Sequence, residues 1–472
     1  MSLYDSDFSG EENLEFEKAN IQEEIKKCKK SIDDGRIYNS LEYIEDVLQM
    51  CIDADMNEDG LYFSEKLIEI FPYNAEYWVK HGICLSGLLR FDEAIKSFEK
   101  SLSLNPADTE VLLDKASAEE SNEMYEQAKE SLKKILSIEP GHDEAYFNLG
   151  LIAQKENNFE EAAGYFKKAI EFDEDYSEAW YELGFSYENL DKLTDALEAY
   201  EKFLDLEPYH ANGWFNRGVV LVRLNQTEQA INSYDLALAL KEDFASAWFN
   251  KGNALADLGR YQPAIECFKK SIELDKNDEA SFYNIGNIYE EMGDLHSAIK
   301  YYTESVKIND QYYEAFIARG YCHDAAGKFQ LALKDFNKAI SLSQDRADAW
   351  YARADLEYSL GQLQNSILSY REALKIEKDN FEVWFNLAET LFELGDWLEA
   401  LNSFDECIRI NPKDANSYYG KAKANFILSR PQEAVECLKT AFTLDPEIKQ
   451  EFEKDYPEIK SSRLFKKLLG EI

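Results

Sequence analysis

The sequence predicts an all-α repeat protein, and three observations predict this fold class. The stretch from Ala179 to Pro208, AWYELGFSYENLDKLTDALEAYEKFLDLEP, returns with the same pattern 34 residues later at Gly213 and again at Ala247. Within each copy, apolar residues recur at helical spacing in two successive stretches. Gly or Pro residues stand at the ends of those stretches, where helices stop. A fixed period of this length indicates a scaffold of tandem helix pairs.

The repeats can be counted in one frame of 34 residues, from Leu41 to Ile448, without an insertion. Twelve units result, which begin at Leu41, Ala75, Thr109, Asp143, Ser177, Ala211, Ala245, Glu279, Tyr313, Ala347, Phe381 and Ala415. The fourth position is aromatic in ten units, and the eighth is Gly or Ala in eleven. The twentieth is Ala in ten units, and the twenty-fourth is aromatic in nine. Twelve copies in register exclude coincidence.

Each recurring position has a mechanical role in a pair of helices. Positions four, seven or eight, and eleven share one face of a first helix, and positions twenty, twenty-four and twenty-seven share one face of a second. The small residues at eight and twenty let the two backbones approach and leave room for the rings. Between the helices, Gly259, Gly293 and Gly395 supply a left-handed residue. Six of the nine prolines occupy position thirty-two, where they end the second helix.

This pattern resembles the tetratricopeptide repeat, and the resemblance covers 408 of the 472 residues. It implies antiparallel helix pairs stacked into a right-handed superhelical α-solenoid, whose first helices line a concave groove. The first and third units depart from the pattern, with Ile44 and Leu112 at the fourth position. Terminal repeats are expected to be atypical because one of their sides faces solvent.

Two segments flank the array of residues 41–448. Residues 1–40 form an acidic N-terminal segment, in which we predict a solvent-exposed helix from Glu11 to Asp33 that ends near Gly35 and has only a ragged apolar face. For residues 449–472 we predict a capping helix or tail. Its apolar stripe, counted from the end of the array, comprises Ile448, Phe452, Tyr456, Leu464, Phe465, Leu468 and Leu469. Arg463, Lys466 and Lys467 leave open an alternative, an amphipathic end that binds a partner or a membrane surface.

The composition limits the partners. A net charge of −41 argues against nucleic acid and against an anionic membrane surface, and it favours a basic partner. The chain starts without a basic, apolar leader, and it has no run of about 18 apolar residues, so we expect a cytoplasmic protein without membrane insertion. The seven scattered cysteines indicate reduced thiols at packing positions.

No catalytic pattern emerges from the sequence. The five histidines lie in different repeats, without metal-ligand spacing, and a P-loop is missing. Cys322 and His323 are adjacent on a helix, so their side chains point about 100° apart. The flanking segments are too short for a catalytic domain. We therefore expect a non-enzymatic protein without catalytic residues, cofactor or metal.

The first helices carry the candidate peptide-binding residues. In the resembled family the groove is lined by positions two, five, six, nine, twelve and thirteen of each unit. The candidates at these positions are Asn148, Phe215, Asn216, Phe249, Asn250, Asn253, Asp257, Tyr283, Asn284, Asn287, Glu290, Glu291 and Asn386. The asparagines resemble the ladder in the repeat arm of O-linked N-acetylglucosamine transferases, although Glu182 interrupts them. An Asn amide both donates and accepts, so a ladder can hold a peptide backbone; the alternative is that these residues are only repeat framework.

These features predict a protein-interaction scaffold whose units six to eight bind an extended, net-basic protein segment. The family's carboxylate clamp, which needs Lys at the second and fifth positions, does not match, because Glu dominates the second position here. Two alternatives remain: a peptide-sensing regulator, and an assembly hub that uses its outer surface and termini. The sequence leaves the oligomeric state open.

Overall fold

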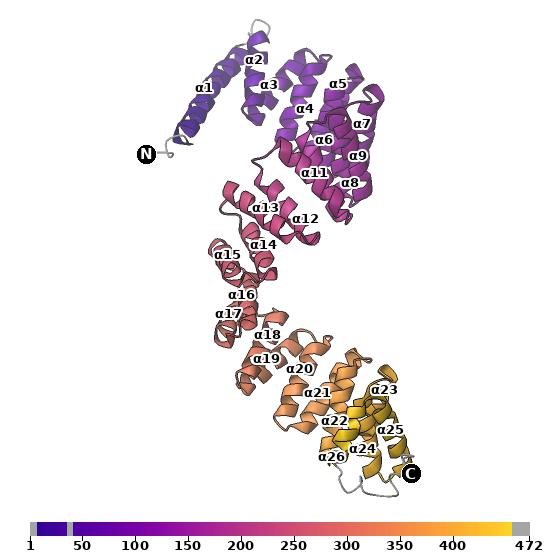
Figure 1. The fold of residues 1–472 in the computed structure, drawn as a ribbon. Coiled ribbons are helices and arrows are strands. Elements are labelled where there is room, and N and C mark those ends of the chain that lie inside the picture. Colours follow the sequence, from indigo (N-terminus) through magenta and orange to yellow (C-terminus); the bar gives the residue numbers. More distant parts are fainter. Residues whose placement is uncertain (1–6, 35–40, 456–472) are drawn as a thin grey trace. The chain divides into compact units, whose positions relative to one another are not determined.

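The computed structural model describes residues 7–34 and 41–455, and the secondary structure of this part is α-helix (Figure 1). The chain divides into two compact units, Met1–Lys241 and Glu242–Ile472, which are described separately. The predicted all-α solenoid of helix pairs is confirmed.

The first compact unit, Met1–Lys241, contains thirteen helices in its described part. They are α1 (Asp7–Asp33), α2 (Leu41–Asp53), α3 (Asn57–Ile70), α4 (Ala75–Gly87), α5 (Phe91–Leu104), α6 (Thr109–Ser121), α7 (Tyr125–Ile138), α8 (Asp143–Lys155), α9 (Phe159–Phe172), α10 (Ser177–Asn189), α11 (Leu193–Leu206), α12 (Ala211–Arg223) and α13 (Thr227–Leu240). From α2 onward, the first helix of each pair begins at the first position of a repeat frame.

The second unit continues in the same frame. Its described helices are α14 (Ala245–Asp257), α15 (Tyr261–Leu274), α16 (Glu279–Glu291), α17 (Leu295–Ile308), α18 (Tyr313–Ala325), α19 (Phe329–Leu342), α20 (Ala347–Ser359), α21 (Leu363–Ile376), α22 (Phe381–Leu394), α23 (Trp397–Ile410), α24 (Ala415–Ile427), α25 (Pro431–Leu444) and α26 (Pro446–Asp455).

The turn inside every pair depends on one left-handed residue at position fifteen. Glycine occupies this position at 259, 293, 327, 361 and 395, with φ between 70° and 94°. The predicted glycine stops are therefore confirmed. The other seven pairs place a non-glycine residue there, namely Asp55, Leu89, Glu123, Asn157, Asp191, Asn225 and Ser429. A side chain with a Cβ atom is strained in this conformation, and Leu has no polar group to compensate the strain.

Leu89 is therefore the position where glycine should help most. Its φ is 58° and its side chain is 75% exposed, so Leu89→Gly removes strain and loses little packing. We expect the free energy of unfolding to rise by about 0.5–1 kcal/mol, the relief of strain less the larger chain entropy of glycine. Chemical denaturation measures this change. The reverse substitution, Gly259→Leu, should lower stability by a similar amount, and a loss of stability in Leu89→Gly would contradict the strain argument.

The core of each pair is built on close contact between position eight and the ring at position twenty-four. A Cβ atom added at Gly218 would lie 2.5 Å from the Tyr234 ring, and one added at Gly286 would lie 2.5 Å from the Tyr302 ring. The same contact occurs at Gly82, Gly150, Gly184, Gly252 and Gly320. The predicted role of the small residue at position eight is confirmed. In the first pair the sizes are reversed, with Leu48 at position eight and Ser64 at position twenty-four, both fully buried.

The tryptophans at position four join successive pairs. The indole Nε1 of Trp78 donates to the carbonyl of Pro72 at 2.9 Å, and that of Trp214 donates to Pro208 at 2.9 Å. Trp180, Trp248 and Trp384 make the same bond to the residue six positions earlier, at 2.8–3.0 Å. The acceptor is always position thirty-two of the preceding unit. These five indoles therefore combine apolar packing with a hydrogen bond to the preceding unit.

Position seven adds polar links that we did not predict. Arg319 of α18 donates to both oxygens of Asp335 on α19, at 2.8 and 2.6 Å, and to Thr303 of α17 at 3.2 Å. Asp335 is 3% exposed, so this ion pair is buried. Arg217 and Arg353 repeat the arrangement with partners sixteen residues before and after them in the sequence. Each of these arginines thus links its own helix pair to the second helix of the preceding pair.

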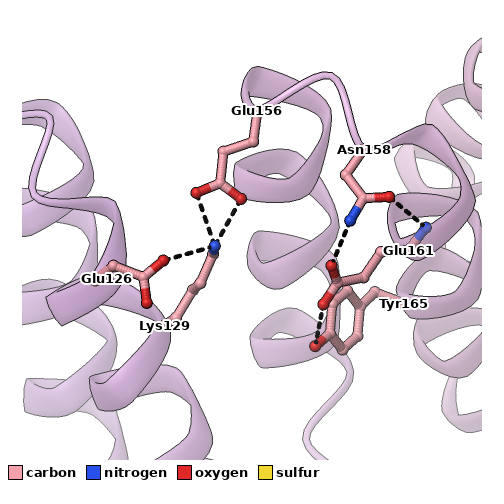
Figure 2. Close-up of polar contacts among 6 residues, drawn as sticks. All are labelled: Glu126, Lys129, Glu156, Asn158, Glu161 and Tyr165. Atoms are coloured by element: carbon pink, nitrogen blue, oxygen red, sulfur yellow. Dashed lines mark hydrogen bonds and ion pairs between the residues drawn. The ribbon is translucent and has the colours of Figure 1, made fainter.

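Charged side chains also connect repeats at the surface, as Figure 2 shows. Lys129 of α7 lies 3.1 Å from Glu126 on its own helix and 2.6 Å from Glu156, the C-cap of α8. Asn158 caps α9 by accepting from the Glu161 amide at 3.4 Å, while its own amide donates to the Glu161 carboxylate at 2.7 Å. Exposed pairs of this kind contribute little each and mainly fix local geometry.

The N-terminal helix corrects one expectation. We expected a solvent-exposed helix, but α1 packs against α2 and buries Ile25 and Cys28, which are 4% and 0% exposed. The reason is that Cys28 completes an apolar stripe with Ile21, Ile25 and Ile32 at three- and four-residue spacing. Polar links accompany it: Tyr43 donates to Glu24 at 2.6 Å. The helix ends at Asp33, as expected, but it begins at Asp7 and not at Glu11.

At the other end, α26 packs on the last pair. Phe452 is 2% exposed, and its ring centroid lies 5.8 Å from that of Phe442 and 6.4 Å from that of Tyr419. Ile448 is buried beside it. The rest of the expected stripe from Tyr456 onward, with Arg463, Lys466 and Lys467, lies outside the described residues.

Candidate functional site

Two adjoining cavities in the second compact unit contain seven of the predicted site residues. We name the first the asparagine cavity; it measures about 460 Å³ and its lining includes Asn253, Asp257, Tyr261, Asn284, Asn287 and Glu291. We name the second the tyrosine cavity; it measures about 510 Å³ and its lining includes Tyr283, Asn287, Glu290, Glu291, Tyr313, Glu314, Ile317, Ala318, Tyr321, Arg346 and Asp348. Asn287 and Glu291 belong to both. The first helices α14, α16 and α18 supply most of this lining.

In the asparagine cavity the amides pair with one another. Asn284 on α16 donates to Asn253 on α14 at 2.8 Å. This bond uses one N–H of Asn284 and one acceptor site of Asn253, and both side chains line the cavity. Asp257 and Glu291 are exposed at its rim. The cavity therefore offers both a donor and an acceptor next to negative charge.

The tyrosine cavity has aromatic walls and a carboxylate edge. The Tyr302 hydroxyl lies 2.6 Å from Glu290 Oε2 and 2.7 Å from Asn287 Oδ1, which orients both of these lining residues. Tyr321 is 42% exposed, and burial with nearby carboxylates raises its pKa to about 12. Tyr321 therefore stays a neutral, polarisable wall at physiological pH.

One arginine side chain lies inside the tyrosine cavity. Arg346, the N-cap residue of α20, places its guanidinium carbon 3.8 Å from the Tyr313 ring centroid. Its two terminal nitrogens bond Glu314 at 2.6 Å and Asp348 at 3.0 Å. Tyr313 also donates to Asp348 at 2.5 Å. Four carboxylates, those of Glu290, Glu291, Glu314 and Asp348, thus line the cavity together with a single cation, Arg346.

Comparison with known families decides what this array is. Models described as "Tetratricopeptide repeat" or "TPR repeat" together match well over half of the 472 residues. They match residues 90–149, 143–176, 177–210, 199–232, 220–259, 245–278, 280–312, 313–346, 354–395, 381–414 and 415–448. The chain is a tetratricopeptide repeat protein. Six of these matches begin at the first residue of a repeat frame that the sequence predicts.

Solved structures of other tetratricopeptide repeat proteins are similar to parts of this one. YrrB, described as having an unusual peptide-binding site, is 25% identical and matches 40% of this chain and 98% of its own, with a TM-score of 0.38. A repeat protein from Parabacteroides merdae is 17% identical over 53% of this chain and 98% of its own, with a TM-score of 0.41. MamA from Desulfovibrio magneticus RS-1 is 22% identical over 36% of this chain and 96% of its own, with a TM-score of 0.35. No curated protein matches the sequence.

As a tetratricopeptide repeat protein, the chain is a protein-interaction scaffold. Members of this family bind protein or peptide partners. No helix among the described residues is long and apolar enough to cross a membrane.

Six predicted site residues of this tetratricopeptide repeat protein lie outside the two cavities. Asn148, Phe215 and Asn216 belong to α8 and α12 of the first compact unit. Phe249, Asn250 and Asn386 belong to α14 and α22 of the second compact unit. The two Phe rings pack internally, Phe215 at 6.0 Å from Tyr234 and Phe249 at 5.7 Å from Phe268, between centroids. The aromatic rings at position five therefore belong in part to the hydrophobic core.

Two of the predicted asparagines serve as repeat framework. Asn216 donates to the Tyr181 hydroxyl at 2.9 Å, and Asn386 donates to the Tyr351 hydroxyl at 3.1 Å. In both cases the partner lies 35 residues earlier, at the fifth position of the preceding unit. These bonds favour the framework alternative for the two residues. Asn253, Asn284 and Asn287 differ because they face the cavities.

The sequence analysis missed Tyr313 and Arg346 as lining residues. Tyr313 is the first residue of its unit, and Arg346 is the last residue of the same unit, so both fall outside the columns that line a groove. A signal existed in Ile317 and Ala318, which break the aromatic and Asn columns. The loss of side-chain volume at these two positions opens the tyrosine cavity.

The adjacent Cys322 and His323 face different neighbours. Burial and Glu290 raise the pKa of the Cys322 thiol to about 12, whereas His323 Nε2 lies 3.9 Å from Asp335. Because the thiol and the imidazole have different partners, they form no nucleophile–base pair. All seven cysteines are buried, and none of them is in a disulfide. Within the described residues, no group of three or more His, Cys, Asp or Glu side chains is placed to hold a metal ion.

Proposed function

We propose that α14, α16 and α18 bind an extended, net-basic segment of a partner protein along the asparagine and tyrosine cavities. The observation that carries this proposal is the continuity of the two cavities, which share Asn287 and Glu291. Together they form one path across consecutive first helices, long enough for several residues of an extended chain. The proposed site therefore comprises units seven to nine, one unit further along the chain than the expected units six to eight.

The asparagine amides supply the hydrogen bonds to a peptide backbone. The free amide oxygen of Asn284 can accept from a backbone N–H, and the Asn253 amide nitrogen can donate to a carbonyl. Asn287 adds a third amide where the cavities join. Amides bond the backbone without selecting side chains, so the segment is held by its extended conformation.

The carboxylates supply the charge preference. Asp257 and Glu291 line the asparagine cavity, and Arg346 neutralises only part of the charge of the tyrosine cavity. The whole chain carries a net charge of −41, which attracts a basic segment over longer range. We therefore expect association to slow as ionic strength rises.

A direct test uses a fluorescein-labelled peptide of four Gly-Ser-Arg units. In the full chain, the triple variant Asn253→Ala, Asn284→Ala, Asn287→Ala should weaken binding at least about tenfold, since each hydrogen bond contributes about 0.5–1.5 kcal/mol. Fluorescence anisotropy measures the affinity. The matched control is Asn148→Ala, Asn216→Ala, Asn386→Ala, which removes three predicted asparagines outside the cavities and should leave affinity unchanged. Equal affinity of the two triple variants, or equal binding of a Gly-Ser-Glu peptide, would sink the proposal.

A further inference from the structure

The tyrosine cavity already accommodates one guanidinium group, and the contacts of that group show which cation the cavity suits. Arg346 stacks on Tyr313 with 3.8 Å between its guanidinium carbon and the ring centroid. Its nitrogens reach Glu314 at 2.6 Å and Asp348 at 3.0 Å. A planar, forked cation makes stacking and two ionic hydrogen bonds at once, which a lysine ammonium cannot.

Room for a second side chain lies beside Arg346. The neighbouring unit has Tyr283 and Asn284 at positions five and six, whereas this unit has Ile317 and Ala318. The missing side-chain volume leaves a cavity of about 510 Å³. This is enough space for an arginine side chain entering from the asparagine cavity.

The tyrosine cavity also contains, among its other lining residues, the same kinds of group that bind Arg346. It has an aromatic face in Tyr321, whose side chain is 42% exposed, and the carboxylates of Glu290 and Glu291. Arg346 is bonded to Glu314 and Asp348, so it does not neutralise this second pair of carboxylates.

We propose that the tyrosine cavity is an arginine-selective subsite, which seats one guanidinium group of the bound segment between the Tyr321 ring and the carboxylates of Glu290 and Glu291. This inference rests on the proposed function and narrows it, because it distinguishes arginine from lysine within a basic segment. The selectivity comes from stacking and from the fork of donors, both of which depend on the planar guanidinium.

The test compares two labelled peptides that differ only in the cation, four Gly-Ser-Arg units and four Gly-Ser-Lys units. The unmodified full chain should bind the arginine peptide about tenfold more tightly, which corresponds to one stacked, forked contact. Tyr321→Leu keeps apolar packing against Phe336 but removes the ring face. In this variant the ratio of the two affinities should fall to about one, since stacking is lost.

Phe185→Leu is the matched control, because Phe185 occupies the same ninth position of another unit and is 40% exposed. It should leave the ratio of affinities unchanged. Equal affinity of the two peptides for the unmodified chain would overturn the arginine subsite and leave the basic-segment proposal standing. A ratio that survives Tyr321→Leu would also overturn it. Binding of neither peptide would overturn both proposals.

Discussion

Replacing Arg319 by Leu is expected to destabilise the second compact unit by about 3–5 kcal/mol, because it leaves a buried carboxylate without its partner. Asp335 is 3% exposed and accepts two hydrogen bonds from Arg319, at 2.8 and 2.6 Å. Another ionisable neighbour is His323, whose Nε2 lies 3.9 Å from the Asp335 carboxylate. Burial lowers the pKa of His323, so the imidazole is neutral near pH 7 and cannot replace the guanidinium.

The double variant Arg319→Leu, Asp335→Ala separates a stranded charge from lost packing. It reproduces the combination of the fifth unit, where Leu183 and Ala199 occupy the same positions and are 3% and 2% exposed. We expect most of the lost stability to return, since neither partner then carries an uncompensated charge. If the double variant is as unstable as the single one, the ion pair is not the cause.

The loss of stability in Arg319→Leu should appear as more frequent local opening of the helix pair α18 and α19. Hydrogen exchange of α18 and α19 measures the local opening, which suits a repeat array better than one global transition.

Replacing Gly286 by Val should cost about 3 kcal/mol, because the valine carbons would occupy the space of the Tyr302 ring. A Cβ atom at this position lies 2.5 Å from that ring. The ring has little freedom to move aside, since its hydroxyl is 2.6 Å from Glu290 and 2.7 Å from Asn287. In units ten and eleven, alanine occupies the same position, as Ala354 and Ala388. One methyl group is therefore tolerated at position eight where the ring is placed accordingly.

Gly164→Val in α9 is the matched control for this substitution. A Cβ atom at Gly164 meets nothing within 4 Å, so the same change should alter stability by no more than about 0.5 kcal/mol. Chemical denaturation of both variants measures the difference. Gly286→Val should also weaken binding of the Gly-Ser-Arg peptide, because Tyr302 positions two cavity residues. Equal stability of the two variants would mean that the ring yields to the valine.

The sequence predicted the fold closely because its strongest constraints are local and repeated. Gly259 and Gly293 mark turns, and the pairing of Gly218 with Tyr234 follows from their sizes alone. The polar links were beyond that reasoning. Arg319 on α18 bonds Asp335 on α19 and Thr303 on α17. A single repeat, considered in isolation, does not show which neighbouring residues a long side chain will contact.

The candidate site was predictable only in part, for a related reason. Asn253, Asn284 and Asn287 were found because groove positions recur in fixed columns. The tyrosine cavity instead arises where those columns fail, at Ile317 and Ala318, and its arginine comes from the last position of the unit. Whether an asparagine faces a cavity or bonds a tyrosine of the preceding unit, as Asn216 does, depends on the neighbour and not on the column.

The tryptophan bonds at position four have a spectroscopic consequence. Five of the seven tryptophans donate their indole N–H to a carbonyl of the preceding repeat, at 2.8–3.0 Å. Each of these fluorophores therefore sits at one junction between repeats, and its emission depends on whether that junction is closed. Variants that retain a single position-four tryptophan would report the opening of one chosen junction, without an added label.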